Sequence, residues 1–314
     1  MIRAEKTNKI QSTNTVVMVP PSAFGFNSQT AVDNEFQIKT DLKPSEISER
    51  AMLEYGNMVQ IMRNSGIRVL ELSPPDSGKG KAPDAVFPNN WFSTNSDGDL
   101  IIYPMAAKNR RIEIRPEELI ELLKLHDYTI GSLHRISGVG TFLEGTGSLV
   151  FDHLNRRIFA AESLRCNAQL FNDYLEKFRY EGIIFKTLSS HSKPIYHTNV
   201  LMSVGMHFAV VCLDAIALQA DRLLVKSALS DRDLIEISIN QMEEYFCGNI
   251  IELSSGSGKS LILMSERALS GFTSKQLAIL GKYGAILPVS IPTIESIGGG
   301  SARCMVAEIF LPRV

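Results

Sequence analysis

The sequence has few cysteines, and none of them lies close to another. The four are Cys166, Cys212, Cys247 and Cys304, and they include no C-x-x-C pair. This spacing indicates neither a disulfide framework nor a zinc site. We therefore expect reduced, unpaired thiols and no bound metal.

Long apolar runs are absent as well. Apolar stretches such as residues 208–213 fall far short of the roughly 20 residues that a membrane-spanning helix needs. The segment Met1–Lys9 lacks the apolar run of a signal peptide. Both absences predict a cytoplasmic protein without a membrane partner.

Neither sign of charge dominates the chain. Its 314 residues include 32 basic and 34 acidic ones, for a formal net charge of -2. The absence of a basic stripe argues against nucleic acid or an anionic membrane as the main partner. We expect a small-molecule partner instead, and the composition leaves open whether the chain forms a homo-oligomer.

A repeated unit is the main feature of the chain. An apolar run, a capped amphipathic helix and a second apolar run recur about five times, at intervals of roughly 50 to 65 residues. No linker-like stretch interrupts them, so we expect an α/β fold in one domain over residues 1–314. Alternation alone would equally fit a doubly wound sheet, but the repeat favours a ring of modules around one central site. The approximate modules are residues 15–75, 84–135, 140–190, 194–255 and 256–314.

Local signals predict several of the elements within these units. The segment Ser238–Gln241 has the pattern of a capping box for a helix that ends near Gly248, and Thr273–Gln276 has the same pattern. Apolar runs predict short strands, among them residues 85–87, 128–130 and 305–311.

Cys304 is a candidate nucleophile because it follows the glycine run Gly298–Gly300, a turn that lets backbone and ligand approach closely. On local grounds alone it would be a small buried side chain at the start of a strand. Two other segments change that balance. They carry Glu144 and His197, so the chain offers a thiol, an imidazole and a carboxylate.

A nucleotide-binding alternative arises from Gly256–Ser260, which looks like a phosphate-binding loop. The Walker pattern needs an earlier glycine, and Leu253 stands in its place. The apolar run after the loop reads as a second strand rather than the helix whose N-terminus would hold phosphate. A hairpin turn is therefore the favoured interpretation.

Four short motifs occur in the order and spacing of a known superfamily, and the motifs are Pro83–Phe87, Leu143–Gly145, Tyr196–Thr198 and Gly299–Cys304. They resemble the guanidino-group-modifying enzymes, the pentein superfamily of arginine deiminases, dimethylarginine dimethylaminohydrolases and amidinotransferases. The resemblance covers nearly all of the chain after residue 14. It implies a five-bladed α/β propeller of ββαβ modules around a central channel, with no metal or organic cofactor.

Within the superfamily the chain looks most like the citrulline-utilisation hydrolases, through the patterns at residues 24–37 and 87–91. The resemblance implies that Cys304 attacks the substrate carbon as a thiolate, made available by a cationic neighbour such as His197 or the substrate. His197 would move protons and titrate near the working pH. Glu144 would orient His197 or bind substrate nitrogens. Locally, a core histidine and a surface acid remain the plainer interpretations.

The resemblance also implies a substrate pocket. Asp84 matches an aspartate that pairs with guanidinium nitrogens, although locally it could cap a turn. Asn89 and Asn90 stand where the dimethylarginine hydrolases carry carboxylates, and Asn199 stands where the deiminases carry an aspartate. Three missing negative charges would suit a neutral ureido group better than a guanidinium, which favours citrulline over arginine.

Arginines and an N-terminal segment complete the expected site. Arg110 or Arg111, together with Arg165, match positions that clamp the substrate carboxylate, while one of the adjacent pair is expected to be solvated. Part of a lid is expected at Phe24, Gly25, Phe26 and Asn27.

The function expected from these residues is hydrolysis of a C–N bond through a covalent Cys304 intermediate. Citrulline would give ornithine, ammonia and carbon dioxide. An arginine deiminase, an amidinotransferase and a catalytically inactive interaction protein of the same fold remain alternatives.

Overall fold

The computed structural model describes residues 10–76, 78 and 80–313. The expectations for Met1–Lys9 lie outside these residues. Over the described part of the chain the strands form five three-stranded sheets. In every sheet the middle strand pairs antiparallel with one neighbour and parallel with the other. The fold is mixed α/β, and one ββαβ pattern is repeated around it.

The bounds of the elements follow that repeat. The sheets are β15 (Ala307–Glu308), β1 (Thr15–Met18) and β2 (Arg68–Glu71); β3 (Phe92–Thr94), β4 (Asp99–Ile102) and β5 (Ser132–Arg135); β6 (Leu149–Asp152), β7 (Arg157–Ala161) and β8 (Glu181–Phe185); β9 (Met202–Val204), β10 (Phe208–Val211) and β11 (Asp233–Glu236); β12 (Ile251–Ser254), β13 (Ser260–Ser265) and β14 (Ala285–Val289).

The helices connect these strands. The α-helices are α1 (Pro44–Asn64), α2 (Pro116–Leu125), α3 (Gly145–Ser148), α4 (Ala168–Phe178), α5 (Thr198–Leu201), α6 (Gln219–Ala228), α7 (Ile239–Glu243), α8 (Glu266–Gly271), α9 (Ser274–Tyr283) and α10 (Pro292–Gly298). The 3-10 helices are η2 (Pro88–Asn90), η3 (Lys108–Glu113), η4 (Leu213–Ala215) and η5 (Ala302–Met305).

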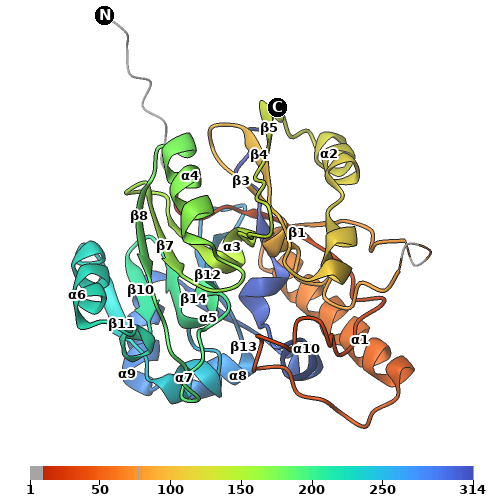
Figure 1. Cartoon of the computed structure of the whole chain (residues 1–314). Coiled ribbons are helices and arrows are strands. Elements are labelled where there is room, and N and C mark those ends of the chain that lie inside the picture. Colours follow the sequence, from red (N-terminus) through yellow and green to blue (C-terminus); the bar gives the residue numbers. More distant parts are fainter. Residues whose placement is uncertain (1–9, 77, 79, 314) are drawn as a thin grey trace, which may run out of the picture.

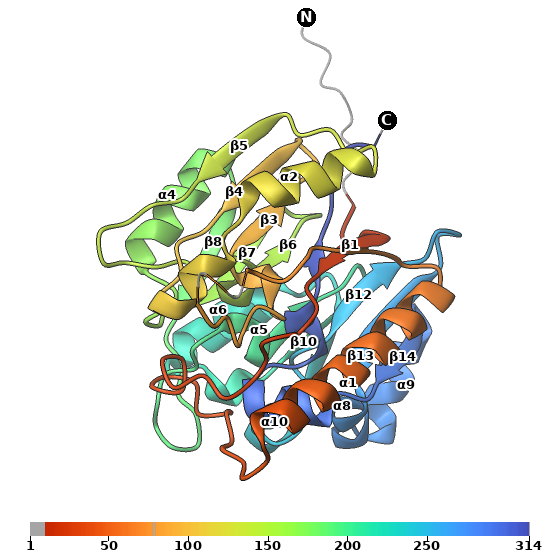
Figure 2. The ribbon, with the colours of Figure 1, turned by 90° about the vertical axis from the view of Figure 1, so that its right-hand side faces the viewer.

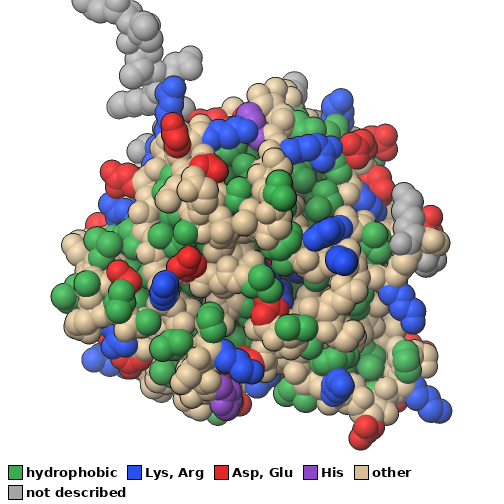
Figure 3. Space-filling model, in the orientation of Figure 1, with side chains coloured by type: hydrophobic (Ala, Val, Ile, Leu, Met, Phe, Trp, Pro, Cys, Tyr) green, Lys and Arg blue, Asp and Glu red, His purple; other side chains and the backbone are tan. Residues whose placement is uncertain are grey.

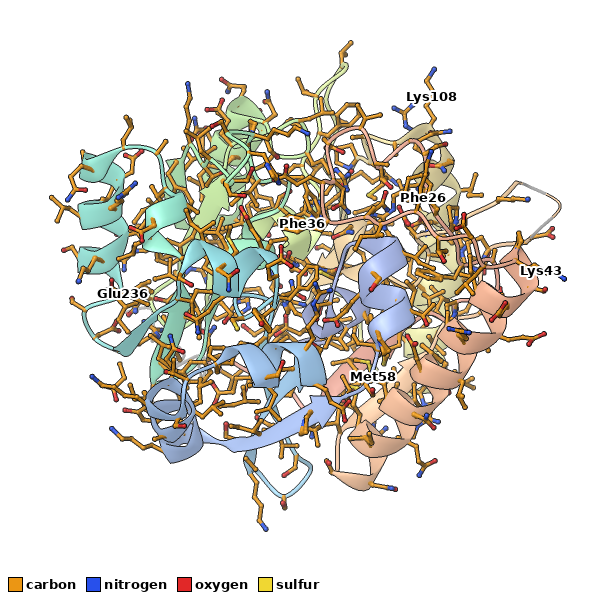
Figure 4. All side chains as sticks on the ribbon, turned by 90° about the horizontal axis from the view of Figure 1, so that it is seen from below. Phe26, Phe36, Lys43, Met58, Lys108 and Glu236 are labelled. Carbon is orange, nitrogen blue, oxygen red and sulfur yellow. The ribbon has the colours of Figure 1, made fainter. Side chains whose placement is uncertain are left out.

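The longer helices lie on the outside of the molecule (Figures 1 and 2). The chain reaches each parallel partner strand through one of them, as a parallel pair requires. Helix α1 crosses from β1 to β2, and α2, α4 and α6 do the same in the next three sheets. Helix α1 turns an apolar face inward: Met58, labelled in Figure 4, is 1% exposed. Burial of such faces holds the helices against the sheets.

The C-terminal strand completes the first sheet. β15 pairs antiparallel with β1, with Val16 opposite Glu308 and Val17 opposite Ala307. Figure 2 shows the blue C-terminal strand beside the red β1. The first sheet is therefore built from segments far apart in the sequence, and the expected module 15–75 is completed by residues near 308.

The last hairpin lies across the expected boundary between modules 194–255 and 256–314. β12 pairs antiparallel with β13, and the Ser255 N–H donates to the Lys259 carbonyl oxygen over 2.8 Å. Gly256–Ser260 is thus the hairpin turn favoured by the sequence, with no helix to hold phosphate.

Some expected elements differ from the observed ones. Residues 85–87 form no strand: the turn at residues 83–86 leads into η2, which Pro88 opens, and the strand begins only at β3. The strand expected at 128–130 begins at Ser132, and the one expected at 305–311 is shortened to β15 by η5. The capping box at Ser238 is present, but its helix α7 ends at Glu243.

The crossover helix of the fourth unit is α6, which the sequence analysis did not predict. Of the α6 residues that the structure describes, Val225 is the one that is buried. A helix that buries so little of its surface needs no regular spacing of apolar residues, so the sequence shows no clear periodic signal for it.

Short helical segments precede the first strand of four sheets. Helix η2 leads into β3, α3 into β6, α5 into β9 and η5 into β15, while a loop leads into β12. These segments lie against one another: α3 contacts both η2 and α5, and η2 contacts η5. The fold therefore gathers the residues just ahead of the first strands at one place.

The surface carries charges of both signs. On the face in Figure 3, acidic and basic side chains are interspersed among apolar and neutral ones. None of the helices in the described part of the chain is long and apolar enough to cross a membrane.

Candidate active site

A small cavity lies where these short segments meet. Its lining residues come from distant parts of the chain: Asn34, Asp84, Phe87, Asn90, Arg110, Arg165, Tyr196, His197, Gly298, Gly300 and Cys304. The free space is about 10 Å³. That is room for roughly one water molecule, so an amino acid could enter only after part of the wall has moved.

A carboxylate and an imidazole form a buried pair beside this cavity. Glu144 precedes α3 and His197 precedes α5, and His197 Nε2 lies 2.9 Å from Glu144 Oε2. Burial raises the pKa of Glu144, but Arg165, His197 and Arg110 outweigh burial and bring that pKa down to about 2. Glu144 is therefore ionised at neutral pH.

His197 has a lowered pKa. Burial lowers the pKa below the usual value for histidine, and the hydrogen bond and charge of Glu144 offset only part of that shift. The lowered pKa favours the neutral imidazole, and titration of His197 near the working pH stays a prediction. The physical reason for the lowered pKa is that the ring is only 2% exposed.

Cys304 lies on η5 and contacts two carboxamides. Asn249 Nδ2 lies 3.2 Å from Cys304 Sγ, and Asn199 Nδ2 lies 3.6 Å from it. Burial raises the pKa of the Cys304 thiol, and the hydrogen bond from Asn249 opposes that rise. Burial thus favours the thiol before substrate binds, and attack as a thiolate made available by His197 or the substrate stays a prediction.

Three polar side chains near the cavity have atoms without a hydrogen-bond partner in the described part of the chain. They are Asp84 Oδ1, Asn90 Oδ1 and both amide atoms of Asn89. Asp84 and Asn90 line the cavity, whereas Asn89 is fully buried behind it. Buried polar atoms without partners are costly, so these groups are suited to binding a polar ligand.

The two adjacent arginines are placed differently. Arg110 lines the cavity, is 1% exposed and binds Glu113 through Nη2 at 2.8 Å. Burial raises the pKa of Glu113, Arg110 offsets part of the rise, and the pKa lies at about 7. Arg111 is exposed and donates through Nε to the Met105 carbonyl oxygen over 3.1 Å. Arg110 is thus the one at the cavity.

Arg165 joins the Glu144 pair to the N-terminal segment. Its Nη1 lies 3.7 Å from Glu144 Oε2, while Nη2 and Nε bind the two oxygens of Asp33 at 2.6 and 2.8 Å. Its guanidinium also lies over the Tyr196 ring, 4.7 Å from the centroid. In this conformation Arg165 is fully engaged by protein groups.

The segment at residues 19–43, here called the lid, contains neither helix nor strand, and its Asn34 lines the cavity. Asn27 Nδ2 and Thr30 Oγ1 donate to Asp84 Oδ2 over 2.7 and 3.0 Å. Phe24 and Asn27 are buried, whereas Gly25 and Phe26 are partly exposed. Figure 4 labels Phe26 and Phe36, the two lid phenylalanines that follow Phe24. The lid therefore contacts the cavity through polar side chains.

A family model described as "N,N dimethylarginine dimethylhydrolase, eukaryotic" matches residues 20–311. The chain belongs to this family. This family is one of the pentein superfamily of guanidino-group-modifying enzymes. Among curated protein sequences, none matches the chain.

Solved structures share the fold at low identity. The apo structure of ArgZ, an arginine dihydrolase from the ornithine-ammonia cycle in cyanobacteria, is 15% identical with a TM-score of 0.72, covering 96% of this chain and 41% of ArgZ. The chain thus spans about two fifths of that protein. The N-terminal domain of ArgZ bound to product is 15% identical with a TM-score of 0.70, covering 95% and 99% of the two chains.

DDAH from Pseudomonas aeruginosa shows the same likeness. A cysteine-to-serine mutant of it complexed with citrulline is 18% identical with a TM-score of 0.65, covering 95% of this chain and all of that one. At such identities the structures show a common fold.

In this chain of the pentein superfamily the sequence analysis missed Asn249, Asp33 and Glu113. Asn249 stands just before β12, as Cys304 stands before β15 and His197 before α5 and β9. That repeated position could have indicated it. Asp33 and Glu113 carry no local signal, because each is recognised only through the arginine that it meets in space.

No group of three or more His, Cys, Asp or Glu suitable for a metal ion occurs among the residues that the structure describes.

Proposed function

We propose that the chain is a cysteine-dependent hydrolase that cleaves the ureido group of citrulline to ornithine, ammonia and carbon dioxide. The proposal includes a single-domain, five-bladed propeller built from the five sheets, acting in the cytoplasm without metal or organic cofactor. One observation carries the choice of substrate: the Asn90 carboxamide lines the cavity with Oδ1 unpaired, where the resemblance implies a carboxylate in dimethylarginine hydrolases.

The first half-reaction starts from neutral groups. Cys304 Sγ bonds to the ureido carbon while the thiol proton passes to His197, giving an imidazolium beside the ionised Glu144. The imidazolium then protonates the leaving nitrogen as the bond between this nitrogen and the ureido carbon breaks. Glu144, 2.9 Å from His197, favours this protonated state without itself taking the proton.

In the second half-reaction His197 takes a proton from water, and the oxygen bonds to the carbon. The C–S bond breaks and the thiol regains a proton. Carbamate released from a carbamoyl intermediate then decomposes to ammonia and carbon dioxide. Each step uses water and the proposed substrate, so no further reactant is needed.

The charge balance near the cavity supports a neutral reacting group. Arg110 is paired with Glu113, and Arg165 is paired with Asp33, so neither cation is available to a new anion in this conformation. Asp84 Oδ1 and Asn90 Oδ1 remain as acceptors for ureido N–H groups. Asn89 and Asn199, both carboxamides, add no negative charge around them.

The amino-acid end of the substrate would bind where the lid now binds. We propose that Arg165 and Arg110 hold the substrate carboxylate once Asp33 has released Arg165 and Glu113 has released Arg110. The two oxygens of Asp33 accept hydrogen bonds from the Arg165 guanidinium in the way that a substrate carboxylate would.

A methylated arginine is a second candidate substrate. The matching family is described by dimethylarginine hydrolysis. Asp84 supports this alternative, because an aspartate on the edge of the cavity with an unpaired oxygen also suits a planar cation.

A product assay tests the proposal. The chain and a Cys304→Ala control are incubated with citrulline, arginine, N,N-dimethylarginine and agmatine, and ornithine, citrulline, ammonia and dimethylamine are measured. Ornithine with ammonia from citrulline alone, absent in the control, is expected. Citrulline with dimethylamine from dimethylarginine would favour the second candidate, and citrulline from arginine would indicate a deiminase.

A further inference from the structure

We propose that Asn249 is a catalytic residue whose side-chain N–H stabilises the Cys304 thiolate. The inference rests on the proposed function, because it concerns how the nucleophile of that reaction is formed. The evidence begins with the position of Asn249 in the loop before β12, where its side chain contacts Cys304, which lies 55 residues later in the chain.

The orientation of the Asn249 amide follows from its second contact. Asn249 Nδ2 lies 2.8 Å from the carbonyl oxygen of Asn199, which can only accept a hydrogen bond. The nitrogen end of the amide must therefore face Asn199. The other hydrogen of the same NH₂ group is then directed at Cys304 Sγ, 3.2 Å away, while Oδ1 lies farther from sulfur at 3.5 Å.

The loop is built to hold this side chain. Asn249 is fully buried, and its backbone N–H donates to the Phe246 carbonyl oxygen over 2.8 Å. Phe246 adopts a positive φ of 55°. A Cβ on Gly248 would lie 2.3 Å from the Val200 carbonyl oxygen, so a glycine is needed for the loop to approach α5 this closely.

Asn249 has the largest effect among the groups that favour the charged sulfur, and a backbone hydrogen bond at Ser301 and the charge of Arg303 also lower the pKa of the Cys304 thiol. In the part of the chain that the structure describes, side-chain hydrogen bonds to Sγ involve only Asn249 and Asn199, and the Asn199 contact is the longer. Burial disfavours the charged sulfur, and a directed N–H donor opposes that penalty. Removal of the donor should therefore leave the thiol present but less acidic.

Alkylation by iodoacetamide tests this directly, because it needs a thiolate but no substrate. The rate at Cys304 is followed by peptide mass spectrometry from pH 6 to 10 in the full chain and in Asn249→Ser and Asn249→Asp. Serine is too short to place a donor where Asn249 Nδ2 lies, so it removes the contact with sulfur, and aspartate keeps the shape of asparagine while adding charge. Cys247→Ala is the control from the same buried loop.

Both Asn249 variants should react at Cys304 about tenfold more slowly at pH 8, with the inflection shifted to higher pH. Cys247→Ala should keep the original profile. An unchanged profile in either Asn249 variant that retains cooperative thermal unfolding would overturn the inference. If one variant does not fold, the other decides. The alkylation rate does not depend on turnover. Failure of the citrulline assay can therefore be told apart from failure of the inference about Asn249.

Discussion

At the residue scale, the site combines groups whose types were predictable with charge states that were not. Cys304, His197 and Glu144 are the thiol, imidazole and carboxylate singled out from short motifs. Burial then raises the pKa of Cys304 and lowers that of His197. These shifts depend on the atoms packed around each group, which local sequence does not specify. Burial therefore favours the neutral thiol and the neutral imidazole.

Gly147 is the residue on which the spacing of the site depends. A Cβ there would lie 2.4 Å from Asn90 Oδ1 and 2.8 Å from the His197 ring. We expect Gly147→Ala to displace both groups and to lower kcat at least about tenfold, because small misplacements of reacting groups are costly. Steady-state kinetics beside thermal unfolding would measure the effect.

Gly281→Ala is the matched control, since Gly281 lies within α9 and a Cβ there meets nothing within 4 Å. It should leave kcat unchanged and slightly raise stability. A Gly147→Ala enzyme with full activity would contradict the proposed geometry.

At the element scale, the lid is the part of the wall most suited to move. It contains no regular secondary structure, and polar contacts join it to the cavity: Asn27 and Thr30 bind Asp84, and Asp33 binds Arg165. Elements with few ladder hydrogen bonds open at lower free-energy cost than strands and core helices. The lid is therefore our candidate for substrate entry.

Asp33→Asn should make the lid open more often. The substitution removes the charge that binds Arg165 through two oxygens, at a cost of about 1 kcal/mol to the closed state. We expect iodoacetamide to alkylate Cys304 about fivefold faster at constant pH. Asp41→Asn, an exposed lid position, should leave the rate unchanged. Equal rates for the two variants would show that the Asp33 contact does not hold the lid.

At the scale of the whole molecule, the five sheets are joined across the ends of the chain. β15 completes the sheet that β1 begins, and His153 lies between the rings of Phe151 and Phe310, at centroid distances of 5.1 and 4.6 Å. The C-terminal segment thus packs against the third sheet as well as the first.

His153 should make the fold sensitive to acid. Burial lowers the pKa of His153 to about 4, a shift that Asp152 opposes and that Arg303 and Arg156 reinforce. The unfolded chain binds a proton near pH 6.5, whereas the folded one does not until about pH 4, so stability falls as pH decreases through this window.

Denaturant unfolding at pH 7 and pH 5 measures this loss. Between pH 7 and pH 5, the free energy of unfolding should fall less in His153→Phe than in the unsubstituted chain. The difference should be at most about 2 kcal/mol, because the His153 ring is partly exposed and its charge is partly screened. An equal loss in both proteins would show that His153 is not the responsible group. His197, also with a lowered pKa, would account for acid sensitivity that remains.

The repeat, the helix caps and the reactive residue types can be predicted from the order of residues alone. Capping boxes at Ser238 and Thr273 are local, since donor and acceptor lie three residues apart, and both are present. The hairpin at Gly256–Ser260 is also local, and it is observed. Short-range geometry of this kind can be read along the chain.

Only the tertiary structure decided which groups meet. Asn249 reaches Cys304, Asp33 reaches Arg165, and β15 reaches β1, although each pair is separated by many residues. Such contacts depend on how the five sheets pack, and burial at those contacts sets the charge of the thiol and the imidazole. The motifs predicted where chemistry could occur, whereas packing determined the state in which the reacting groups rest.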